Sequence, residues 1–588
     1  MNQIPEPQDP SDTRRLLTAV GLSIAVMLVW TWLFPPPPPP PPTSGDGSTA
    51  ASVATPATPT GASPASVAAA SADALKDVAE ETKTLVASSG HELVVTNRDG
   101  QVQAWDLTEA QYRKASGPDA RALRMVEPPS AGQQRGVFLP PRVELSLDGK
   151  ETALPYALSV DGESVVARAK DSASGVEIER VFKPGAAPYT FEVTLRLRNS
   201  SARAVPYEVG ALLRGAQKDS EASTGLLALF APPVHLFEGV CQTAESLERQ
   251  TLDVVASNVA SDDASDKPTF SNGVRWAGVD NRYFLTAFVP DAQGIERCEY
   301  AVGGAAARVT PDQMTSEFRY LSTRVALPGG EVAAGQTVER TFTLYGGPKK
   351  LDALESMTPS LDAAVDFGWL STLALPMLKV MQWFYGLLPN WGVAIILLTV
   401  LVKLLTLPLT VSQNRSMAGM KALAPKVEEI KKRYPSEPMR ANQEVMELYK
   451  ANGVNPLSGC LPMLLMMPVY FALYKTIYSA VELYHAELGG WITDLSAADP
   501  YFVLPLVLGA AMFVQTRMTP SGGDPVQQKI MQTFMPVLFT AMMLFLPSGL
   551  VVYILANTLL GILQQHYQNG LAAAAPKVEV VDGVGRRG

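Results

Sequence analysis

Cysteine and histidine are both scarce in this chain of 588 residues. Its three cysteines exclude a disulfide-dense scaffold and show no zinc-ligand spacing, but Cys241 and Cys298 could pair if their part of the chain is exported. Cys460 falls at the edge of a predicted membrane segment and is interpreted as a small apolar residue. The four histidines are scattered, so they offer little material for a histidine-centred active site.

Nucleotide-binding and hydrolase signatures are missing as well. The chain has no G-x-x-x-x-G-K-[ST] loop, which excludes a direct nucleoside-triphosphate motor, and neither H-E-x-x-H nor G-x-S-x-G occurs. The paired carboxylates of a sugar enzyme cannot be assigned across a β-sandwich from sequence. We therefore expect no enzymatic activity, no metal, no cofactor and no specific nucleic-acid site.

Charged residues are also rare inside the long apolar runs, and the exception is informative. The run 390–410 is long enough to span a bilayer, yet it contains Lys403. A charge at the bilayer centre costs about 2.5–3.5 kcal/mol on insertion scales, so such residues usually face a polar cavity or a partner. The alternative is that Lys403 extends its ammonium group to the nearby lipid headgroups.

Uncharged polar side chains recur in the neighbouring predicted spans. Gln515 and Asn557 would converge on Lys403 if their helices are neighbours. The alternative is ordinary hydrogen bonding between helices, worth about 0.6 kcal/mol per contact. The candidate residues of a polar groove are therefore Lys403, Thr399, Gln515, Tyr553 and Asn557.

The N-terminal part predicts an anchor and a linker. An apolar run at 16–34 follows Arg14 and Arg15 and has no cleavage signal directly after it, which predicts an uncleaved signal anchor behind a cytoplasmic tail at 1–15. Residues 35–80 are rich in proline, alanine, serine and threonine and have few large apolar side chains. Such a segment cannot bury enough surface to fold, so we expect a linker.

Residues 81–347 show the period-two pattern of strands. Between residues 189 and 198 apolar and polar side chains alternate, which places one face in a core and the other in water. Turn signals separate several similar short runs. Mostly antiparallel strands over this length predict one large exported β-sandwich.

The last part of the chain predicts a helical membrane domain. Residues 366–389, interrupted by Pro376, suit an interfacial amphipathic helix, with a transmembrane span as the alternative. Five spans are predicted at 390–410, 461–480, 501–517, 530–547 and 549–567. The connecting segments are 411–460, 481–500 and 518–529, and the tail is 568–588.

Charge bias orients these spans. The loop 411–460 carries eight lysines and arginines, whereas the loop 481–500 carries none. The positive-inside rule therefore places the first loop in the cytoplasm and the second in the periplasm. With the N-terminal anchor this predicts six spans, with both ends of the chain in the cytoplasm.

The basic loop has a helical period of its own. Two short amphipathic helices joined by a turn at Pro435-Ser-Glu-Pro438 predict a helical hairpin. The hairpin is either a docking surface for an incoming segment or a solvated loop whose charge only fixes the topology. The candidate docking residues are Lys426, Lys431, Lys432, Arg433, Tyr434 and Arg440.

Several motifs in this part resemble those of one known family, the bacterial YidC membrane protein insertases. The resemblance is carried by Asn390-Trp-Gly-Val-Ala-Ile-Ile, Val454-Asn-Pro, Gly459-Cys-Leu-Pro, Asp524-Pro-Val-Gln-Gln-Lys-Ile-Met and Pro547-Ser-Gly-Leu. The anchor and the exported domain resemble the long form found in Gram-negative inner membranes. That form implies a galactose-mutarotase-like supersandwich in the periplasm, and the best-matching segment here is Trp276-Ala-Gly-Val-Asp-Asn-Arg-Tyr-Phe-Leu-Thr-Ala.

The resemblance implies an insertase and chaperone for nascent inner-membrane proteins, working alone or with the Sec translocase in the lipid bilayer. It further implies a hydrophilic groove open to the cytoplasm, in which the key charged residue is usually an arginine. Lys403 occupies that position here. Lysine keeps the positive charge but lacks the two-pronged guanidinium with which arginine binds a carboxylate. The ribosome is another partner that the resemblance implies, although the family's tail is often longer and more basic. A channel or secondary transporter is the alternative function.

Overall fold

The computed structural model describes residues 75, 78–87, 90–112, 122–127, 136–218, 236–260, 269–271, 273–302, 318–435, 437–452, 457–518 and 530–574. The predicted cytoplasmic N-tail, the signal anchor and nearly all of the linker lie outside these residues. Most of the loop 518–529 and the end of the C-terminal tail do so as well.

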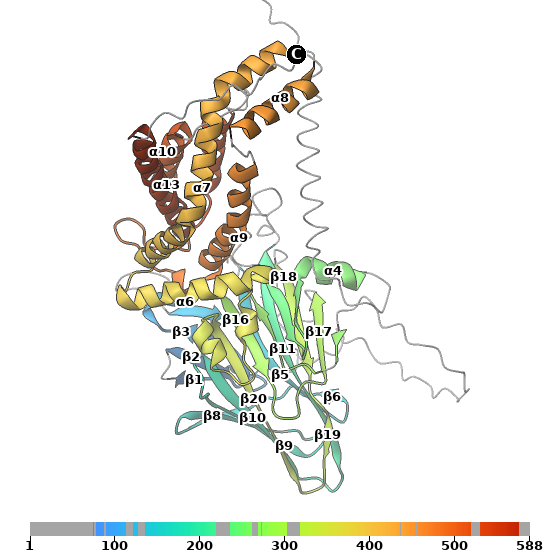
Figure 1. Cartoon of the computed structure of the whole chain (residues 1–588). Helices are drawn as coiled ribbons and strands as arrows, with labels where there is room; N and C mark the ends of the chain where they lie inside the picture. Colours follow the sequence, from blue (N-terminus) through green and yellow to red (C-terminus); the bar gives the residue numbers. More distant parts are fainter. Residues whose placement is uncertain are drawn as a thin grey trace, which may run out of the picture. The chain divides into compact units, whose positions relative to one another are not determined.

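Two sheets of mostly antiparallel strands form the strand-rich region (Figure 1). The eleven-stranded sheet has the order β1-β2-β3-β4-β5-β11-β18-β17-β14, with β6 beside β5 and β19 beside β11. The nine-stranded sheet has the order β13-β12-β15-β16-β20-β10-β9-β8-β7. The two packed sheets confirm the expected large β-sandwich.

The strands of the eleven-stranded sheet are β1 (Thr82–Ala87), β2 (His91–Thr96), β3 (Gln101–Leu107), β4 (Leu123–Val126), β5 (Val137–Leu147), β6 (Lys150–Glu151), β11 (Val205–Lys218), β14 (Thr269–Phe270), β17 (Arg297–Val302), β18 (Phe318–Ala326) and β19 (Gly330–Val332). Those of the nine-stranded sheet are β7 (Ala157–Asp161), β8 (Ser164–Lys170), β9 (Val176–Pro184), β10 (Thr190–Asn199), β12 (Glu238–Gln242), β13 (Leu247–Thr251), β15 (Trp276–Asp280), β16 (Phe284–Val289) and β20 (Thr337–Pro348).

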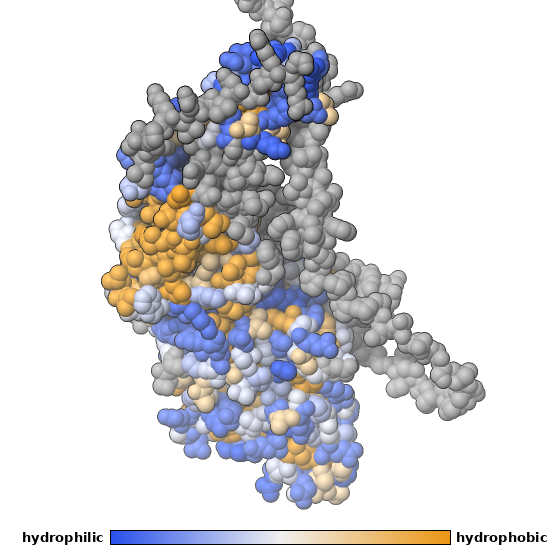
Figure 2. Space-filling view, in the orientation of Figure 1, coloured by the Kyte–Doolittle hydropathy of each residue, from blue (hydrophilic) through white to orange (hydrophobic). Residues whose placement is uncertain are grey.

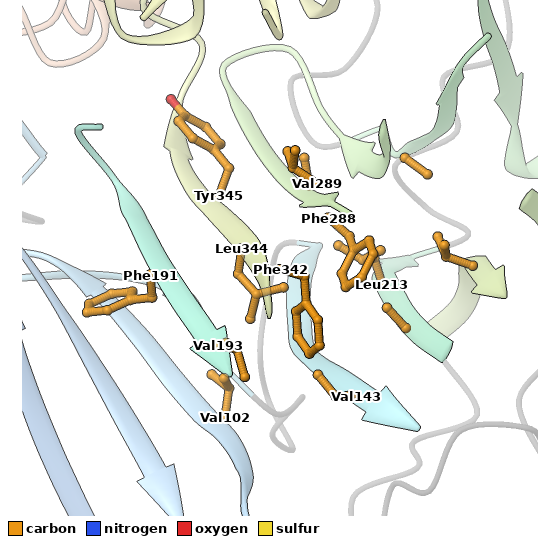
Figure 3. Packing of buried hydrophobic residues seen from close by; sticks show 14 of the residues in the cluster. Val102, Val143, Phe191, Val193, Leu213, Phe288, Val289, Phe342, Leu344 and Tyr345 are labelled. Atoms are coloured by element: carbon orange, nitrogen blue, oxygen red, sulfur yellow. The ribbon is translucent and has the colours of Figure 1, made fainter. Parts of the chain in front are cut away.

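The core of the sandwich lies between the sheets. The alternation predicted between residues 189 and 198 is confirmed on β10. Its apolar residues Phe191, Val193, Leu195 and Leu197 are fully buried. Figure 3 shows residues of this core, with Val143 and Leu213 contributed by the eleven-stranded sheet and Phe288 and Phe342 by the nine-stranded sheet. Burial of such side chains is the main force that holds the two sheets together.

A disulfide also joins the two sheets. It links Cys241 on β12 to Cys298 on β17, with 6.6 Å between their Cα atoms. The sequence left this pairing open, and the structure forms it. A cross-link between residues this far apart in the chain typically adds about 2–4 kcal/mol by restricting the unfolded state.

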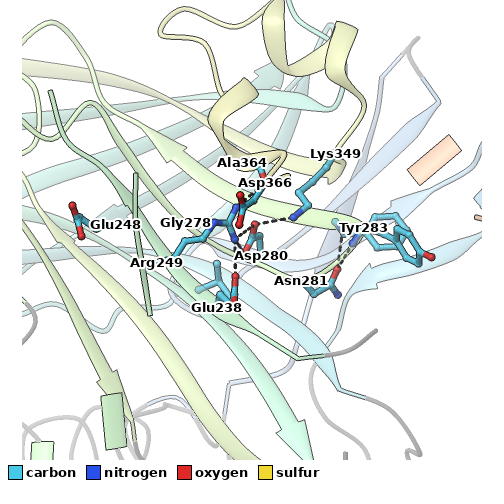
Figure 4. Close-up of polar contacts among 12 residues, drawn as sticks. Glu238, Glu248, Arg249, Gly278, Asp280, Asn281, Tyr283, Lys349, Ala364 and Asp366 are labelled. Atoms are coloured by element: carbon cyan, nitrogen blue, oxygen red, sulfur yellow. Dashed lines mark hydrogen bonds and ion pairs between the residues drawn. The ribbon is translucent and has the colours of Figure 1, made fainter. Parts of the chain in front are cut away.

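A buried ion cluster connects the sandwich to the segment that leads into the membrane domain (Figure 4). The carboxylate of Asp280 on β15 pairs with Arg249 and with Lys349, both at 3.0 Å. Arg249 also pairs with Glu238 at 2.7 Å and donates through Nη2 to the carbonyl oxygen of Ala364 at 2.7 Å. These bonds fix the chain just before the helical part begins.

The helices begin with the short η1 (Ala110–Tyr112), α4 (Leu252–Ala260), α5 (Leu351–Glu355), η5 (Asp362–Ala364) and η6 (Gly368–Leu370). The helical domain contains α6 (Ser371–Leu387), α7 (Trp391–Arg433), α8 (Pro438–Ala451), α9 (Leu457–Ser479), η7 (Val481–Leu483), α10 (Val503–Met518), the π-helical turn η8 (Ile530–Phe534), α12 (Met535–Met543) and α13 (Ser548–Ala574).

Helix α6 occupies the segment expected to form an amphipathic helix. It buries Ala374, Leu378 and Met381, while Trp383 is 61% exposed. The expected interruption at Pro376 was wrong, because the helix continues through it. Pro376 is the sixth residue of the helix, which continues without the backbone hydrogen bond that an N–H at this position would make to Thr372.

Helix α7 is longer than expected. We predicted a span ending near residue 410 and a separate helix in the loop, but one helix of 43 residues covers both. Its first turn is capped by Asn390, whose Oδ1 accepts from the backbone N–H of Val393 at 3.0 Å. The helix continues through Pro408, and on both sides of it the hydroxyls of Thr406 and Thr410 donate to backbone carbonyls of the preceding turn.

Two of the described helices are long and apolar enough to cross a bilayer, judged by length and composition. They cover Trp391–Val411 and Ser548–Gln568. Val503–Met518 and Gln532–Met543 are shorter apolar helices. At 1.5 Å per residue, α7 is about 65 Å long, roughly twice the thickness of a hydrocarbon core.

Candidate functional site around Lys403

Four helices surround the lysine found in the apolar run. Helix α13 packs against α7, α9 and α10, and α7 also packs against α9 (Figure 1). Side chains from all four helices can therefore meet near the middle of α7.

Lys403 contacts a neutral amide on α13. Its Nζ lies 3.5 Å from Oδ1 of Asn557, and both side chains are half-buried. Within the described part of the chain Lys403 forms no ion pair.

Gln515 reaches the same place from α10. A methyl group added at Gly561 would lie 2.5 Å from Nε2 of Gln515 and 3.8 Å from Nζ of Lys403. The missing side chain at Gly561 thus leaves the space in which the amide and the ammonium approach α13. The expected convergence of Gln515 and Asn557 on Lys403 matches this geometry.

Two tyrosines extend the polar cluster. The side chain of Tyr470 on α9 lies beside Asn557, and Tyr553 lies close to Tyr470. Tyr553 is only 5% exposed, so it supports the cluster from inside the helix packing. We call Lys403, Gln515, Asn557 and Tyr470 the Lys403 cluster.

Thr399 does not join the Lys403 cluster directly. Its buried hydroxyl donates to the carbonyl oxygen of Ile395, one turn earlier on α7, at 2.7 Å. Toward the other end of α7, Nε2 of Gln564 donates to the hydroxyl of Thr410 at 2.8 Å. Polar contacts between α7 and α13 therefore continue from Lys403 toward Thr410.

The opposite direction along α7 is apolar. Ala394, Ile395 and Leu398 are almost completely buried and share one core cluster with Leu550 and Val551 of α13. Between Lys403 and the start of α7, the two helices therefore contact each other through apolar side chains. Between Lys403 and Thr410, they contact each other through polar side chains.

The predicted hairpin forms, and polar contacts join its two helices at the turn. The hydroxyl of Tyr434 donates to Glu444 of α8 at 2.7 Å, and the guanidinium of Arg440 lies 5.1 Å from the Tyr434 ring centroid. Leu423 and Ala441 are buried where the two helices pack. Tyr434 and Arg440 therefore stabilise the turn.

Three exposed basic residues of the hairpin lie together at the end of α7. The last turn of α7 contains Lys431, Lys432 and Arg433, whose side chains face solvent. Their positive charges interact favourably with the negative, C-terminal end of the helix dipole. Lys426 is half-buried. On α8, Met439 is 78% exposed and Met446 is 55% exposed.

Figure 2 shows where apolar side chains gather on one face of the helical domain. They cover the surface around α7 and α13, whereas the surface over α8 is hydrophilic (Figure 2). The exposed apolar side chains include Leu404, Leu405, Leu506, Val537, Phe545 and Leu563. A contiguous exposed apolar surface is typical of a contact with a membrane or with another protein.

Sequence reasoning missed three members of this region. Gly561 and Tyr470 were not singled out, and Thr410 was not connected with Gln564. A sequence signal for part of this region is the spacing of Asn557, Gly561 and Gln564, which puts two polar side chains and a gap between them on one face of α13.

Family models match nearly the whole described chain. The model of the YidC periplasmic domain matches residues 86–380, and the model of the 60Kd inner membrane protein matches residues 383–574. A membrane protein insertase YidC from Geotalea daltonii is 32% identical over 563 residues, which cover 95% of this chain and 99% of that protein. The YidC insertase of Marinobacter nauticus is 44% identical over 309 residues, and this alignment spans 52% of each protein, about half the length of that relative.

A galactose mutarotase-like protein from Lactobacillus casei is 9% identical, with a TM-score of 0.28, over 45% of this chain and 100% of that chain. The relatives that extend over the full length are insertases and not enzymes. This chain belongs to the YidC family of membrane protein insertases and combines the β-sandwich periplasmic domain of that family with its helical membrane domain.

Proposed function

We propose that this insertase carries nascent inner-membrane proteins past the Lys403 cluster, which attracts the acidic and polar parts of their tails. One observation carries the proposal: the half-buried ammonium of Lys403 is bonded to the neutral amide of Asn557 and not to a carboxylate. An acidic client group can supply the missing negative charge. The pair that forms offsets part of the desolvation cost of both charges.

The hairpin of α7 and α8 is the proposed first contact. Its exposed basic turn at Lys431, Lys432 and Arg433 attracts acidic segments, and the exposed Met439 and Met446 can adapt to irregular apolar ones. The client's polar tail then enters between α7, α10 and α13. Polar contacts from Thr410 to Lys403 line that route.

The apolar segment of the client is proposed to leave sideways into lipid. Phe471 on α9 and Val537 on α12 are exposed apolar side chains along which it can slide. The driving force is the transfer of apolar surface out of water, about 25 cal/mol per Å². Neither a nucleotide nor another cofactor is needed for that step.

Topology and partners complete the proposal. The charge difference between the loops 411–460 and 481–500 supports six spans with both ends in the cytoplasm of an inner membrane. In this arrangement the Lys403 cluster is open to the cytoplasm and the buried apolar end of α7 faces the periplasm. Work beside the Sec translocase and contact with the ribosome follow from the family resemblance.

The closed end of α7 argues against a channel or transporter. Ala394, Ile395 and Leu398 pack tightly with α13, which leaves no polar path along that part of the helix. A channel requires such a path across the whole membrane. Planar bilayers containing the full chain should therefore show no ion conductance.

A photo-cross-linking experiment tests the proposal. Tyr470 is replaced by benzoylphenylalanine in the full chain, and a stalled nascent membrane protein with a short acidic tail is presented to membrane vesicles. The proposal predicts a cross-link from position 470 and none from the same probe at Val160, which is 58% exposed on the sandwich. A stalled client that never cross-links to position 470 would contradict it.

A further inference from the structure

The turn between β15 and β16 reaches from the periplasmic domain to α9. Arg282 in this turn donates through Nε to the carbonyl oxygen of Tyr478 at 2.6 Å. Its guanidinium carbon lies 3.2 Å from the centroid of the Tyr478 ring. Both parts of the chain belong to one compact unit, residues 62–588. Arg282 thus holds the end of α9 by a hydrogen bond and a cation–π contact.

The turn itself is rigid. Oδ1 of Asn281 accepts from the backbone N–H groups of Tyr283 and Phe284, at 3.0 and 2.9 Å. Tyr283 is almost completely buried, and its ring packs against Tyr484 with centroids 5.3 Å apart. Because this turn is held by these contacts, it can fix the position of the end of α9. The turn also lies in the segment of the sandwich that best matches the family's sequence motif.

A row of tyrosines runs from this contact toward the Lys403 cluster. Tyr470, Tyr474 and Tyr478 are spaced four residues apart, so they lie on one face of α9. The rings of Tyr474 and Tyr478 stack with centroids 5.5 Å apart. At the other end of the row, Tyr470 lies beside Asn557, the residue that contacts Lys403.

We propose that Arg282 is a positioning residue for the Lys403 cluster. It holds the end of α9, and the tyrosine row transmits the position of that end to Tyr470 and Asn557. The periplasmic domain would then tune insertion from outside the membrane. This inference rests on the proposed function of Lys403.

The test measures the insertion rate of an acidic-tailed membrane protein into vesicles that contain the full chain. Arg282→Ala should slow insertion about three- to ten-fold, a size typical of changes along a coupled network. Arg282→Lys should restore most of the rate, because an ammonium can still bond the carbonyl oxygen and lie over the ring. Arg297→Ala is the matched control, since this arginine is 54% exposed and pairs within its own strand.

A double-mutant cycle asks whether Arg282 acts through Tyr478. Tyr478→Leu keeps apolar volume and removes the ring, so it should slow insertion as Arg282→Ala does. The double variant should be no slower than the slower single variant. Fully additive losses would overturn the proposed route.

A second readout separates positioning from a loss of folding. With Cys460→Ser as background, Thr406→Cys places a thiol one turn from Lys403, and its alkylation by a membrane-impermeant maleimide is timed. Arg282→Ala should change this rate at least three-fold, and Arg297→Ala should leave it unchanged. An unchanged alkylation rate in Arg282→Ala would overturn the inference, even if less protein is recovered.

Lys403→Ala, run in parallel, distinguishes this inference from the proposed function. If Lys403→Ala inserts normally, the proposed function fails and this inference fails with it. If Lys403→Ala is slow while Arg282→Ala matches the unmodified chain, only the role of Arg282 is disproved.

Discussion

The ammonium of Lys403 lies 3.5 Å from the amide oxygen of Asn557, and this contact joins α7 to α13. This hydrogen bond gives the ammonium group of Lys403 an acceptor without neutralising its positive charge. Under the proposed function, an amide partner suits a site that receives a transient negative group and releases it again. A permanent carboxylate partner would occupy the cation that, in this proposal, the client needs.

Gly561→Ala should impair insertion without weakening the fold. The added methyl would lie 2.5 Å from Nε2 of Gln515, at the free end of a flexible side chain that can move away. Moving it removes a polar group beside Lys403, whereas alanine is a better helix former than glycine by about 1 kcal/mol. We expect an unchanged or higher unfolding midpoint and an insertion rate lowered by about three-fold, the effect of roughly 0.6 kcal/mol.

Gly386→Ala is the control for that variant. Gly386 lies in α6, and an added methyl there meets no other atom within 4 Å. It should leave insertion unchanged. Equal insertion rates for the two variants would show that the space beside Gly561 has no role.

Asp280→Asn should destabilise the periplasmic domain by about 3–5 kcal/mol, because it leaves two buried cations with too little negative charge. Arg249 and Lys349 both contact this carboxylate, whose side chain is 1% exposed. Burial lowers the pKa of Lys349, and Asp280 is the main group that opposes this shift. Urea unfolding of the full chain, followed by a probe on the sandwich, measures the loss.

Asp253→Asn provides the comparison for Asp280. Asp253 pairs with Arg319 on the surface, and its side chain is 65% exposed. Exposed pairs contribute about 0–1 kcal/mol, so stability should change little. A similar small loss in both variants would mean that the cluster of Figure 4 does not hold the sandwich together.

Glu482→Gln should remove a pH-dependent part of the stability. Burial raises the pKa of the Glu482 carboxyl above its usual 4.5, although Gln382 donates to it at 2.9 Å. The folded state therefore binds this proton more tightly than the unfolded state. The resulting stabilisation is fully present below pH 4.5 and is lost as the pH rises through the raised pKa.

Unfolding midpoints of the full chain from about pH 4 to 8 test this prediction. The unmodified chain should lose stability with rising pH more steeply than the Glu482→Gln variant, whose amide oxygen can still accept from Gln382. The control is Glu355→Gln, at an exposed carboxylate that pairs with Lys379. Identical slopes in the Glu482→Gln variant and the unmodified chain would contradict the assignment.

Some features of this structure can be predicted from the sequence alone. A lysine inside an apolar run is recognisable from the sequence alone. The alternation of apolar and polar residues on β10 likewise predicts a half-buried strand. The orientation of Gln515 and Asn557 toward Lys403 followed from placing their helices side by side. Each of these features depends on local spacing or on one simple assumption about neighbours.

Other features depend on packing that spacing does not reveal. The partners of Asp280 come from β13 and from the end of β20, far away in the chain. Tyr470 reads as one aromatic residue among several on α9 until its neighbour Asn557 is known. The continuity of α7 was missed because Pro408 suggests the end of a helix, whereas the helix runs through it to Arg433.

The most direct test of the central claim is the insertion rate of one small membrane protein, made with an acidic or a neutral tail, in vesicles that contain Lys403, Lys403→Arg or Lys403→Ala. Lys403→Ala should slow the acidic-tailed client at least about ten-fold, the effect of 1.4 kcal/mol, and should affect the neutral-tailed client less. Lys403→Arg should insert both clients well. If Lys403→Ala inserts the acidic-tailed client as fast as the unmodified chain does, the charge of Lys403 does not drive insertion.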